Sequence, residues 1–162
     1  MSEKGYDFPV SWDQFHRDSK ALAWKLADKG SWRGIIAVTR GGLFPAGVVA
    51  RELEIRLIET FCISTYDHKD QRGTEILKTV EGNGDGWIVI DDLVDTGNTA
   101  KIIRERLPKA HIATVYAKPE GLPQVHSYVT EVSQNTWIHF PWDLELKFAQ
   151  PIADQKAKTQ VA

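Results

Sequence analysis

The sequence predicts an α/β protein with a mostly parallel, twisted sheet flanked by helices, and three observations support this. Short apolar runs rich in β-branched residues, such as 35–38 and 87–90, have the composition of strands covered on both faces. Segments with helical spacing of apolar residues alternate with these runs. Polar, glycine-containing loops follow two of the strands, at 39–42 and 91–99. Such loops form the edge at which open α/β sheets bind ligands.

Length and composition restrict the classes of protein to which the chain can belong. With 162 residues, of which 42% are apolar, the chain suits one domain over 1–162, with a core at about 10–118. The formal net charge of −2 and the lack of a Lys/Arg cluster argue against a nucleic-acid surface. The polar start and the lack of 18 consecutive apolar residues lead us to expect a cytoplasmic protein. The single cysteine, Cys62, is expected to pack in the core.

The first predicted element is a helix that begins at Ser11. Ser11 and Gln14 have the spacing of a capping box, and Gly30 is a plausible stop. Its expected buried stripe consists of Trp12, Phe15, Leu22 and Leu26.

The next elements follow from composition and turn residues. They are a strand at 35–38, a helix at 44–53, a strand at 57–64, a polar loop at 66–74 and a return strand at 75–80. Pro45 fits the first turn of the second helix, where proline is tolerated. The glycine-rich segment 82–86 is a turn.

The second half continues the alternation. It gives a strand at 87–90, a helix at 100–107 that stops before Pro108, and a strand at 111–117. From Lys118 onward the predicted elements are short, and the segment is rich in aromatic residues and interrupted by prolines. The polar tail at 153–162 is expected to fray.

The loop at 91–99 combines two kinds of chemistry. Small and turn-forming residues at 96–99 can present backbone N–H groups to an anion at a helix N-terminus. Asp91, Asp92 and Asp95 would repel a bare phosphate, so they indicate an additional ligand group. Vicinal ribose hydroxyls and Mg²⁺ both suit carboxylate oxygens. The loop therefore predicts a site for a sugar phosphate with a divalent metal.

A second anion loop follows the strand at 35–38. Gly41 and Gly42 allow the backbone to approach a ligand closely, and the guanidinium of Arg40 offers a fork of donors to phosphate oxygens. We expect pyrophosphate to bind here.

Asp91 and Asp92, followed by Asp-Thr-Gly-Asn-Thr at 95–99, resemble the phosphoribosyl pyrophosphate motif of the type I phosphoribosyltransferases. Further similarity to the purine-salvage members of this family lies at 39–42, 64–68, 117–119 and 136–143, so that the resemblance extends from about Trp12 to Pro151. It implies the type I phosphoribosyltransferase fold, with a small C-terminal hood at about 119–152 that binds the base.

The resemblance also implies roles for individual residues. Phosphoribosyl pyrophosphate would be bound by Arg40, Gly41, Arg72, Asp91, Asp92, Asp95, Thr96, Gly97, Asn98 and Thr99. The purine would contact Asp95, Lys118, Trp137 and Ile138, and Mg²⁺ would be held by Asp92 and Asp143. Asp95 is the implied catalytic residue, which either accepts the purine proton or only orients the base. The loop around Arg72 would be a lid. The peptide bond after Arg40 can be cis in this family, and the sequence leaves open whether it is cis or trans.

The implied activity is transfer of ribose 5-phosphate to guanine, xanthine and, less well, hypoxanthine, with His139 and Phe140 bearing on this ranking. The resemblance further implies a homotetramer, with some contact with the inner membrane surface. Two alternatives are a phosphoribosyltransferase for another nucleobase and a non-catalytic nucleotide-binding regulator with the same fold.

Overall fold

The computed structural model describes residues 5–68, 71–143 and 151–160, with the side chains of 66–68, 71–72 and 157–160 not included. Its contacts group the chain into two compact units, one of residues 16–134 and one of residues 1–15 with 135–162. The expected division into a core at 10–118 and a hood at 119–152 stays a prediction.

A six-stranded sheet forms the centre of the unit 16–134. Its order is β4-β3-β2-β5-β6-β7, and all neighbours are parallel except the antiparallel pair β3 and β4. The strands are β2 (Gly34–Thr39), β3 (Ile58–His68), β4 (Gln71–Lys78), β5 (Trp87–Val94), β6 (His111–Ala117) and β7 (Ser127–Glu131). The predicted mostly parallel α/β sheet is therefore confirmed.

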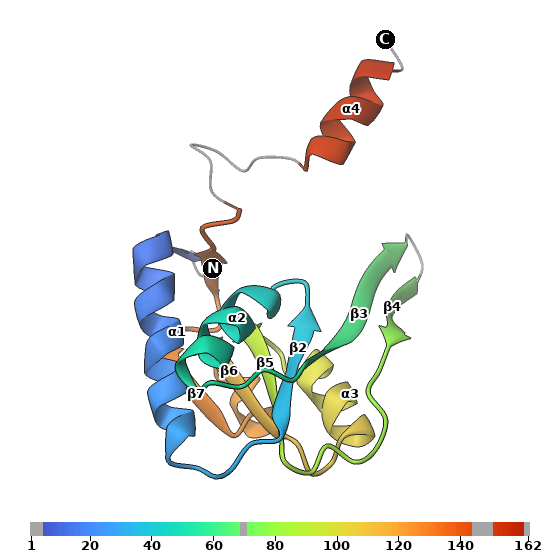
Figure 1. The fold of residues 1–162 in the computed structure, drawn as a ribbon. Helices are drawn as coiled ribbons and strands as arrows, with labels where there is room; N and C mark the ends of the chain where they lie inside the picture. The colour runs from blue at the N-terminus through green and yellow to red at the C-terminus, as the bar shows by residue number, and fades with distance from the viewer. Residues whose placement is uncertain (1–4, 69–70, 144–150, 161–162) are drawn as a thin grey trace. The chain divides into compact units, whose positions relative to one another are not determined.

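Two helices connect the parallel strands in opposite directions (Figure 1). The chain passes from β2 through α2 (Leu43–Glu52) outward to β3, and from β5 through α3 (Asn98–Arg106) outward to β6. Right-handed crossovers that run in opposite directions place α2 and α3 on opposite faces of the sheet. The carboxyl ends of β2 and β5 are thus the switch point of the topology, where such sheets bind ligands.

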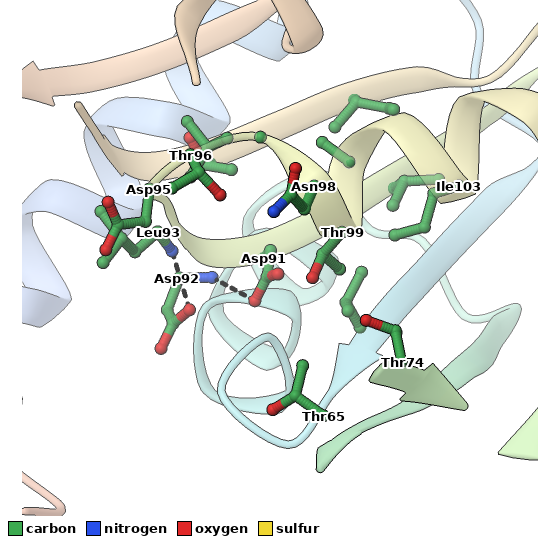
Figure 2. Close-up of a pocket in the computed structure, with 17 residues that line it drawn as sticks. Thr65, Thr74, Asp91, Asp92, Leu93, Asp95, Thr96, Asn98, Thr99 and Ile103 are labelled. Carbon is green, nitrogen blue, oxygen red and sulfur yellow. Dashed lines mark hydrogen bonds between the residues drawn. The ribbon is translucent and has the colours of Figure 1, made fainter. Parts of the chain in front are cut away.

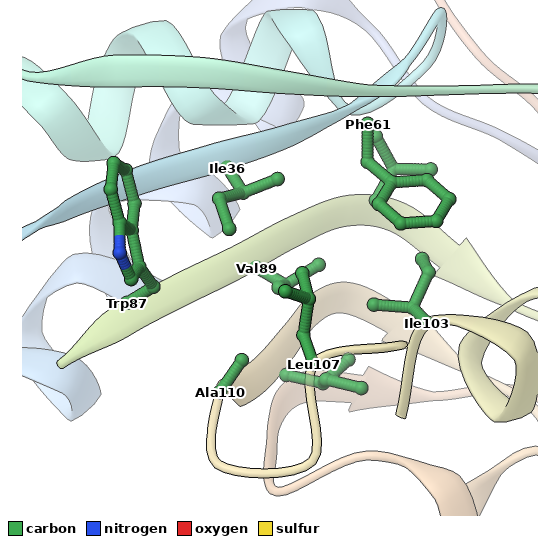
Figure 3. Packing of buried hydrophobic residues seen from close by; sticks show 9 residues of the cluster. Ile36, Phe61, Trp87, Val89, Ile103, Leu107 and Ala110 are labelled. Atoms are coloured by element: carbon green, nitrogen blue, oxygen red, sulfur yellow. The ribbon is translucent and has the colours of Figure 1, made fainter. Parts of the chain in front are cut away.

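Apolar side chains from α3 pack on one face of the sheet (Figure 3). Ile103 and Leu107 of the α3 segment contact a buried cluster that includes Ile36 of β2 and Val89 of β5. Ile35 and Ile88 alternate with these residues along the strands and are also fully buried. Burial on both faces explains why the strands are nearly continuous apolar runs.

The other unit holds a two-stranded parallel sheet of β1 (Tyr6–Pro9) and β8 (Thr136–His139). Its aromatic cluster includes Phe140 and Trp142, whose rings stack 4.7 Å apart, and Phe15, which meets Trp142 edge-on at 5.0 Å. The short helix α4 (Ile152–Gln160) follows. We expected a frayed tail over most of this segment, but its Ala, Gln and Lys residues favour a helix.

The helix α1 (Trp12–Ala27) begins as predicted, because Ser11 Oγ accepts a hydrogen bond of 3.1 Å from the Gln14 N–H group. Phe15, Leu22 and Leu26 are buried. The expectation for Trp12 was wrong, because its side chain is 54% exposed and only partly covered by Trp142, 6.0 Å away.

Two boundaries differ from the prediction. The expected polar loop at 66–74 is largely strand, because β3 continues to His68 and β4 begins at Gln71 in an antiparallel ribbon. Asp91 and Asp92 lie in β5 itself, which continues to Val94 because Asp91 and Leu93 still pair with β6. Within the residues described, no helix combines the length and apolar character needed to cross a membrane.

Candidate functional site

The two predicted anion loops meet at the switch point between β2 and β5. A Cβ atom placed on Gly41 would overlap the Asp92 carboxylate, so this side chain lies directly against the backbone of the first loop. Gly42 is equally enclosed, by the carbonyl oxygens of Val38 and Ile90. Glycine is therefore required at 41 and 42 for the approach of the two loops.

A pocket of about 290 Å³ opens above the carboxyl end of β5 (Figure 2). Gly97 precedes α3 with a φ of +91°, a left-handed conformation that favours glycine. The following residues begin the helix, so its first N–H groups are available to an anion. The pocket is lined by residues 91–100 and by Val38, Thr65, Thr74, Val89, Ile103, Ile112 and Thr114.

The adjacent carboxylates are held by their own backbone. Asp91 accepts a 2.8 Å hydrogen bond from the Asp92 N–H group, and Asp92 accepts one of 2.7 Å from the Leu93 N–H group. Burial raises the pKa of Asp91 well above its usual range, and the negative charge of Asp92 raises it further. A bound cation would relieve the repulsion between these neighbouring carboxylates, and hydroxyl groups could donate to them.

The first loop has one unusual peptide bond. The Thr39–Arg40 peptide is cis, so the special bond precedes Arg40 rather than following it as the resemblance implied. The Leu43 N–H group donates to the Arg40 carbonyl over 3.0 Å and closes the loop onto α2. The Arg40 side chain is exposed and free to reach an anionic ligand.

Asp95 belongs to a polar cluster beside the loop at 96–99. Lys118, only 6% exposed, donates from Nζ to Asp95 Oδ2 over 3.1 Å. Gln134 donates from Nε2 to Asp95 Oδ1 over 2.8 Å. Both oxygens of a half-exposed carboxylate are thus occupied by donors from the ends of β6 and β7. The structure brings Asp95 and Lys118 together as the purine assignment requires.

The remaining expected base-binding residues lie in the other unit. Trp137 is 68% exposed, which leaves its ring faces accessible for stacking, whereas Ile138 is buried. His139 contacts Asp7 at 2.8 Å, and the Asp143 N–H group donates to the Phe140 carbonyl over 2.9 Å. Their roles toward a base or a metal stay predictions.

Some expectations lie outside the described side chains, and some residues were missed. The side chain of Arg72 is not among those described, so its role in a lid stays a prediction. Four residues at the site were not predicted from the sequence: Gln134 and the pocket-lining threonines Thr65, Thr74 and Thr114. A lone glutamine or threonine carries no pattern of its own, so only proximity in the fold could identify these residues.

The carboxylates at the pocket are the candidate ligands for Mg²⁺. Among the side chains that the structure describes, no three of His, Cys, Asp or Glu gather as a protein-only metal site would need. Two neighbouring carboxylates at a phosphate pocket nevertheless fit Mg²⁺, which commonly binds through one or two carboxylates together with substrate phosphates and water.

A family model of the phosphoribosyl transferase domain matches residues 11–149. The chain belongs to the phosphoribosyltransferase family. Among its phosphoribosyltransferase relatives, a protein of Desulfotalea psychrophila named xanthine-guanine phosphoribosyltransferase is 59% identical over 152 residues, 93% of this chain and 95% of the relative. A protein of Nitratidesulfovibrio vulgaris with the same name is 60% identical over 149 residues, 91% of each chain.

A solved phosphoribosyltransferase has the same fold. The crystal structure of a purine phosphoribosyltransferase from Pyrococcus horikoshii superposes with a TM-score of 0.75 at 27% identity, and covers 89% of this chain and 99% of its own. The resemblance inferred from the motif at 91–99 and the type I phosphoribosyltransferase fold that it implied are both confirmed.

Proposed function

We propose that this protein is a purine-salvage enzyme that transfers ribose 5-phosphate from phosphoribosyl pyrophosphate to guanine and xanthine, and less well to hypoxanthine. The products would be GMP, XMP or IMP and pyrophosphate. The observation that carries this proposal is the contact of Gly41 with Asp92, which joins two anion loops around one pair of carboxylates. Two phosphate-binding loops on either side of a sugar site match a substrate with a phosphate at one end and a pyrophosphate at the other.

The charges of the site match the expected transition state. Loss of pyrophosphate leaves positive charge on the ribose, so Asp91 and Asp92 would stabilise that side and hold the ribose hydroxyls. Arg40 and the N–H groups of its loop would stabilise the leaving pyrophosphate. The start of α3 and residues 96–99 would hold the 5-phosphate.

Mg²⁺ would be held by Asp92 together with the pyrophosphate, with Asp143 as the second expected ligand, and would neutralise charge on the leaving group. Replacing Asp92 with alanine should raise the Mg²⁺ and phosphoribosyl pyrophosphate concentrations needed for half-maximal rate together, because the two ligands share this carboxylate. A change confined to purine affinity would contradict the placement.

Lys118 and Asp95 account for the choice of base. The Lys118 ammonium would donate to the oxygen at position 6, and Asp95 would face N7 of the purine, with Trp137 stacking on the ring and the Ile138 backbone at its edge. Adenine carries an amino donor at position 6, so its binding would leave the buried ammonium facing another donor. Sites built for one hydrogen-bonding group can reject its replacement by about 10⁴-fold.

The test is a comparison of kcat/KM for guanine, xanthine, hypoxanthine, adenine, uracil and orotate, each with phosphoribosyl pyrophosphate and Mg²⁺. We expect the first two to react fastest and adenine to fail. Reaction of adenine within tenfold of guanine would remove Lys118 from base selection. Turnover of a pyrimidine would favour a different nucleobase specificity, and no turnover with any base would favour the non-catalytic regulator.

The proposal includes a homotetramer that works in the cytoplasm. Large apolar side chains with high exposure, among them Trp24 and Leu77, support association into oligomers. Sedimentation of the protein at several concentrations measures this directly. Contact with the inner membrane surface stays a prediction of the resemblance, and the proposed function does not depend on it.

A further inference from the structure

The Gln134 side chain has both ends occupied in the segment between β7 and β8. Its Nε2 donates to Asp95 Oδ1 over 2.8 Å, and its Oε1 accepts from the Glu120 N–H group over 3.0 Å. The two partners identify the ends of the amide without ambiguity, since a carboxylate can only accept from Nε2 and a backbone N–H can only donate to Oε1. Gln134 is thus fixed by the turn after β6 and directed at Asp95.

Gln134 and Lys118 hold Asp95 in different ways. The proposed purine would compete with Asp95 for Lys118. The Lys118 ammonium would have to donate to the oxygen at position 6 of the purine as well as to Asp95 Oδ2. Gln134 holds the other oxygen and already has its own acceptor satisfied by the backbone. The amide can therefore keep the carboxylate in place while Lys118 turns toward the base.

We propose that Gln134 is a positioning residue for the transfer reaction, which keeps Asp95 directed at the purine nitrogen when Lys118 engages the base. This inference rests on the proposed function. Gln134 would act through Asp95 and would have no contact with the phosphoribosyl part of the substrate. Replacing Gln134 should lower kcat, the rate of the bound complex, more than it changes the affinity for phosphoribosyl pyrophosphate.

A purely structural role predicts a different outcome. The bond from the Glu120 N–H group could simply tie the β7–β8 segment to the turn after β6. Gln134→Glu separates the two roles, because a carboxylate still accepts from this N–H group but cannot donate to Asp95. It also places a like charge beside Asp95, which a lower pH would relieve by protonation.

The experiment measures kcat, the KM values for guanine and phosphoribosyl pyrophosphate, and the melting temperature for the wild-type protein, Gln134→Glu, Gln134→Met and the exposed control Glu131→Ala. We expect both Gln134 variants to lose about 10- to 100-fold in kcat, the scale of a misplaced catalytic group. The KM for phosphoribosyl pyrophosphate should stay within about twofold, and Gln134→Glu should recover part of its kcat as the pH is lowered. Glu131→Ala should behave as the wild type.

The outcomes separate this inference from the proposed function. An inactive wild-type protein would overturn the proposed function and this role with it. An active wild type with normal kcat in Gln134→Glu would overturn the role of Gln134 alone. A rise in KM for phosphoribosyl pyrophosphate that accounts for the whole loss, or a large drop in melting temperature for Gln134→Glu at neutral and low pH alike, would also assign Gln134 to the scaffold.

Discussion

The two ends of the central sheet differ in how their polar groups are satisfied. At the carboxyl end, the Asp92 carboxylate lies against Gly41, and the pKa of Asp91 is raised by burial and by the neighbouring Asp92. At the other end, where β6 and β7 begin, the His111 ring lies 2.8 Å from the Ser127 hydroxyl, and His126 Nδ1 accepts from the Ile112 N–H group over 2.9 Å.

The carboxyl end has the features expected of a ligand site, whereas the other end has those of a packed scaffold. Burial and the neighbouring Asp92 charge raise the pKa of Asp91, so ionised Asp91 costs stability in the free protein. At the opposite end, the His111 and His126 rings have hydrogen-bonding partners, and Gly34 packs under the Trp87 ring. Substitutions at the first end should change kinetics, and substitutions at the second should change stability.

The largest expected effect is on turnover. Asp95→Asn should lower kcat by about 10²-fold or more, because it removes the carboxylate that we propose to face the purine nitrogen. Binding of phosphoribosyl pyrophosphate should change far less. Steady-state kinetics measure both, with Asp85→Asn in the exposed turn at 82–86 as a control that removes the same charge. An unaltered kcat would exclude Asp95 from the mechanism.

Gly41→Ala should be nearly as damaging. The added methyl group would overlap the Asp92 carboxylate and force the two anion loops apart. A displacement of about 1 Å can cost on the order of 10²-fold, so we expect kcat/KM for phosphoribosyl pyrophosphate to fall about 10- to 100-fold. Gly47→Ala in α2, where no atom lies within 4 Å of the new methyl group, is the matched control. Equal kinetics for the two variants would argue against this contact.

Gly34→Ala addresses the opposite end of the sheet. Its new methyl carbon would lie 2.6 Å from the Trp87 ring and 2.8 Å from the Leu57 carbonyl oxygen. Overpacking of this kind typically costs about 1 to 3 kcal/mol of the free energy of unfolding. Urea denaturation measures the loss, while KM values should be unchanged in the folded fraction. If Gly34→Ala altered substrate affinity and left stability intact, the division between the two ends would be wrong.

Acid should weaken the histidine end. Burial, with the neighbouring charges of His126 and Lys29, lowers the pKa of His111 from 6.5 to about 4. The unfolded chain therefore binds more protons between these values, so the stabilisation is complete above pH 6.5 and is lost as the pH falls toward 4. Discounted for partial exposure, the loss should be about 1 to 2 kcal/mol. Urea denaturation from pH 8 to pH 4 should show it, and His111→Gln should remove it.

The smallest expected effect is a gain in stability at the carboxyl end of the sheet, with a pH dependence opposite to that of His111. Since the pKa of Asp91 is raised in the folded state, its contribution is most favourable at low pH and is lost as the pH rises through that value. Asp91→Asn should thus increase stability at pH 7.5 without Mg²⁺, by about 0.5 to 2 kcal/mol. The same variant should lose activity. A destabilised variant would mean that the charge of Asp91 is already compensated in the free protein.

The sequence predicted much of this fold because its signals are local. The apolar runs at 35–38 and 111–117, the glycines of the first loop and the acids at 91–95 each follow a rule that needs only neighbouring residues. Predictions failed where pairing between distant segments decided the outcome. Polar residues up to His68 and from Gln71 look like a loop, but each strand supplies the hydrogen-bonding partner of the other.

Residue chemistry and spacing alone predicted two anion-binding loops and a pair of carboxylates, and resemblance to a known family identified the phosphoribosyltransferase motif. Only the tertiary structure decided which groups meet. Gly41 touches Asp92 although 51 positions separate their numbers, and Asp95 takes its donors from Lys118 and Gln134 on two later segments. The reason is that strand order, which is not written in any local pattern, brings the ends of β2, β5, β6 and β7 to one edge of the sheet.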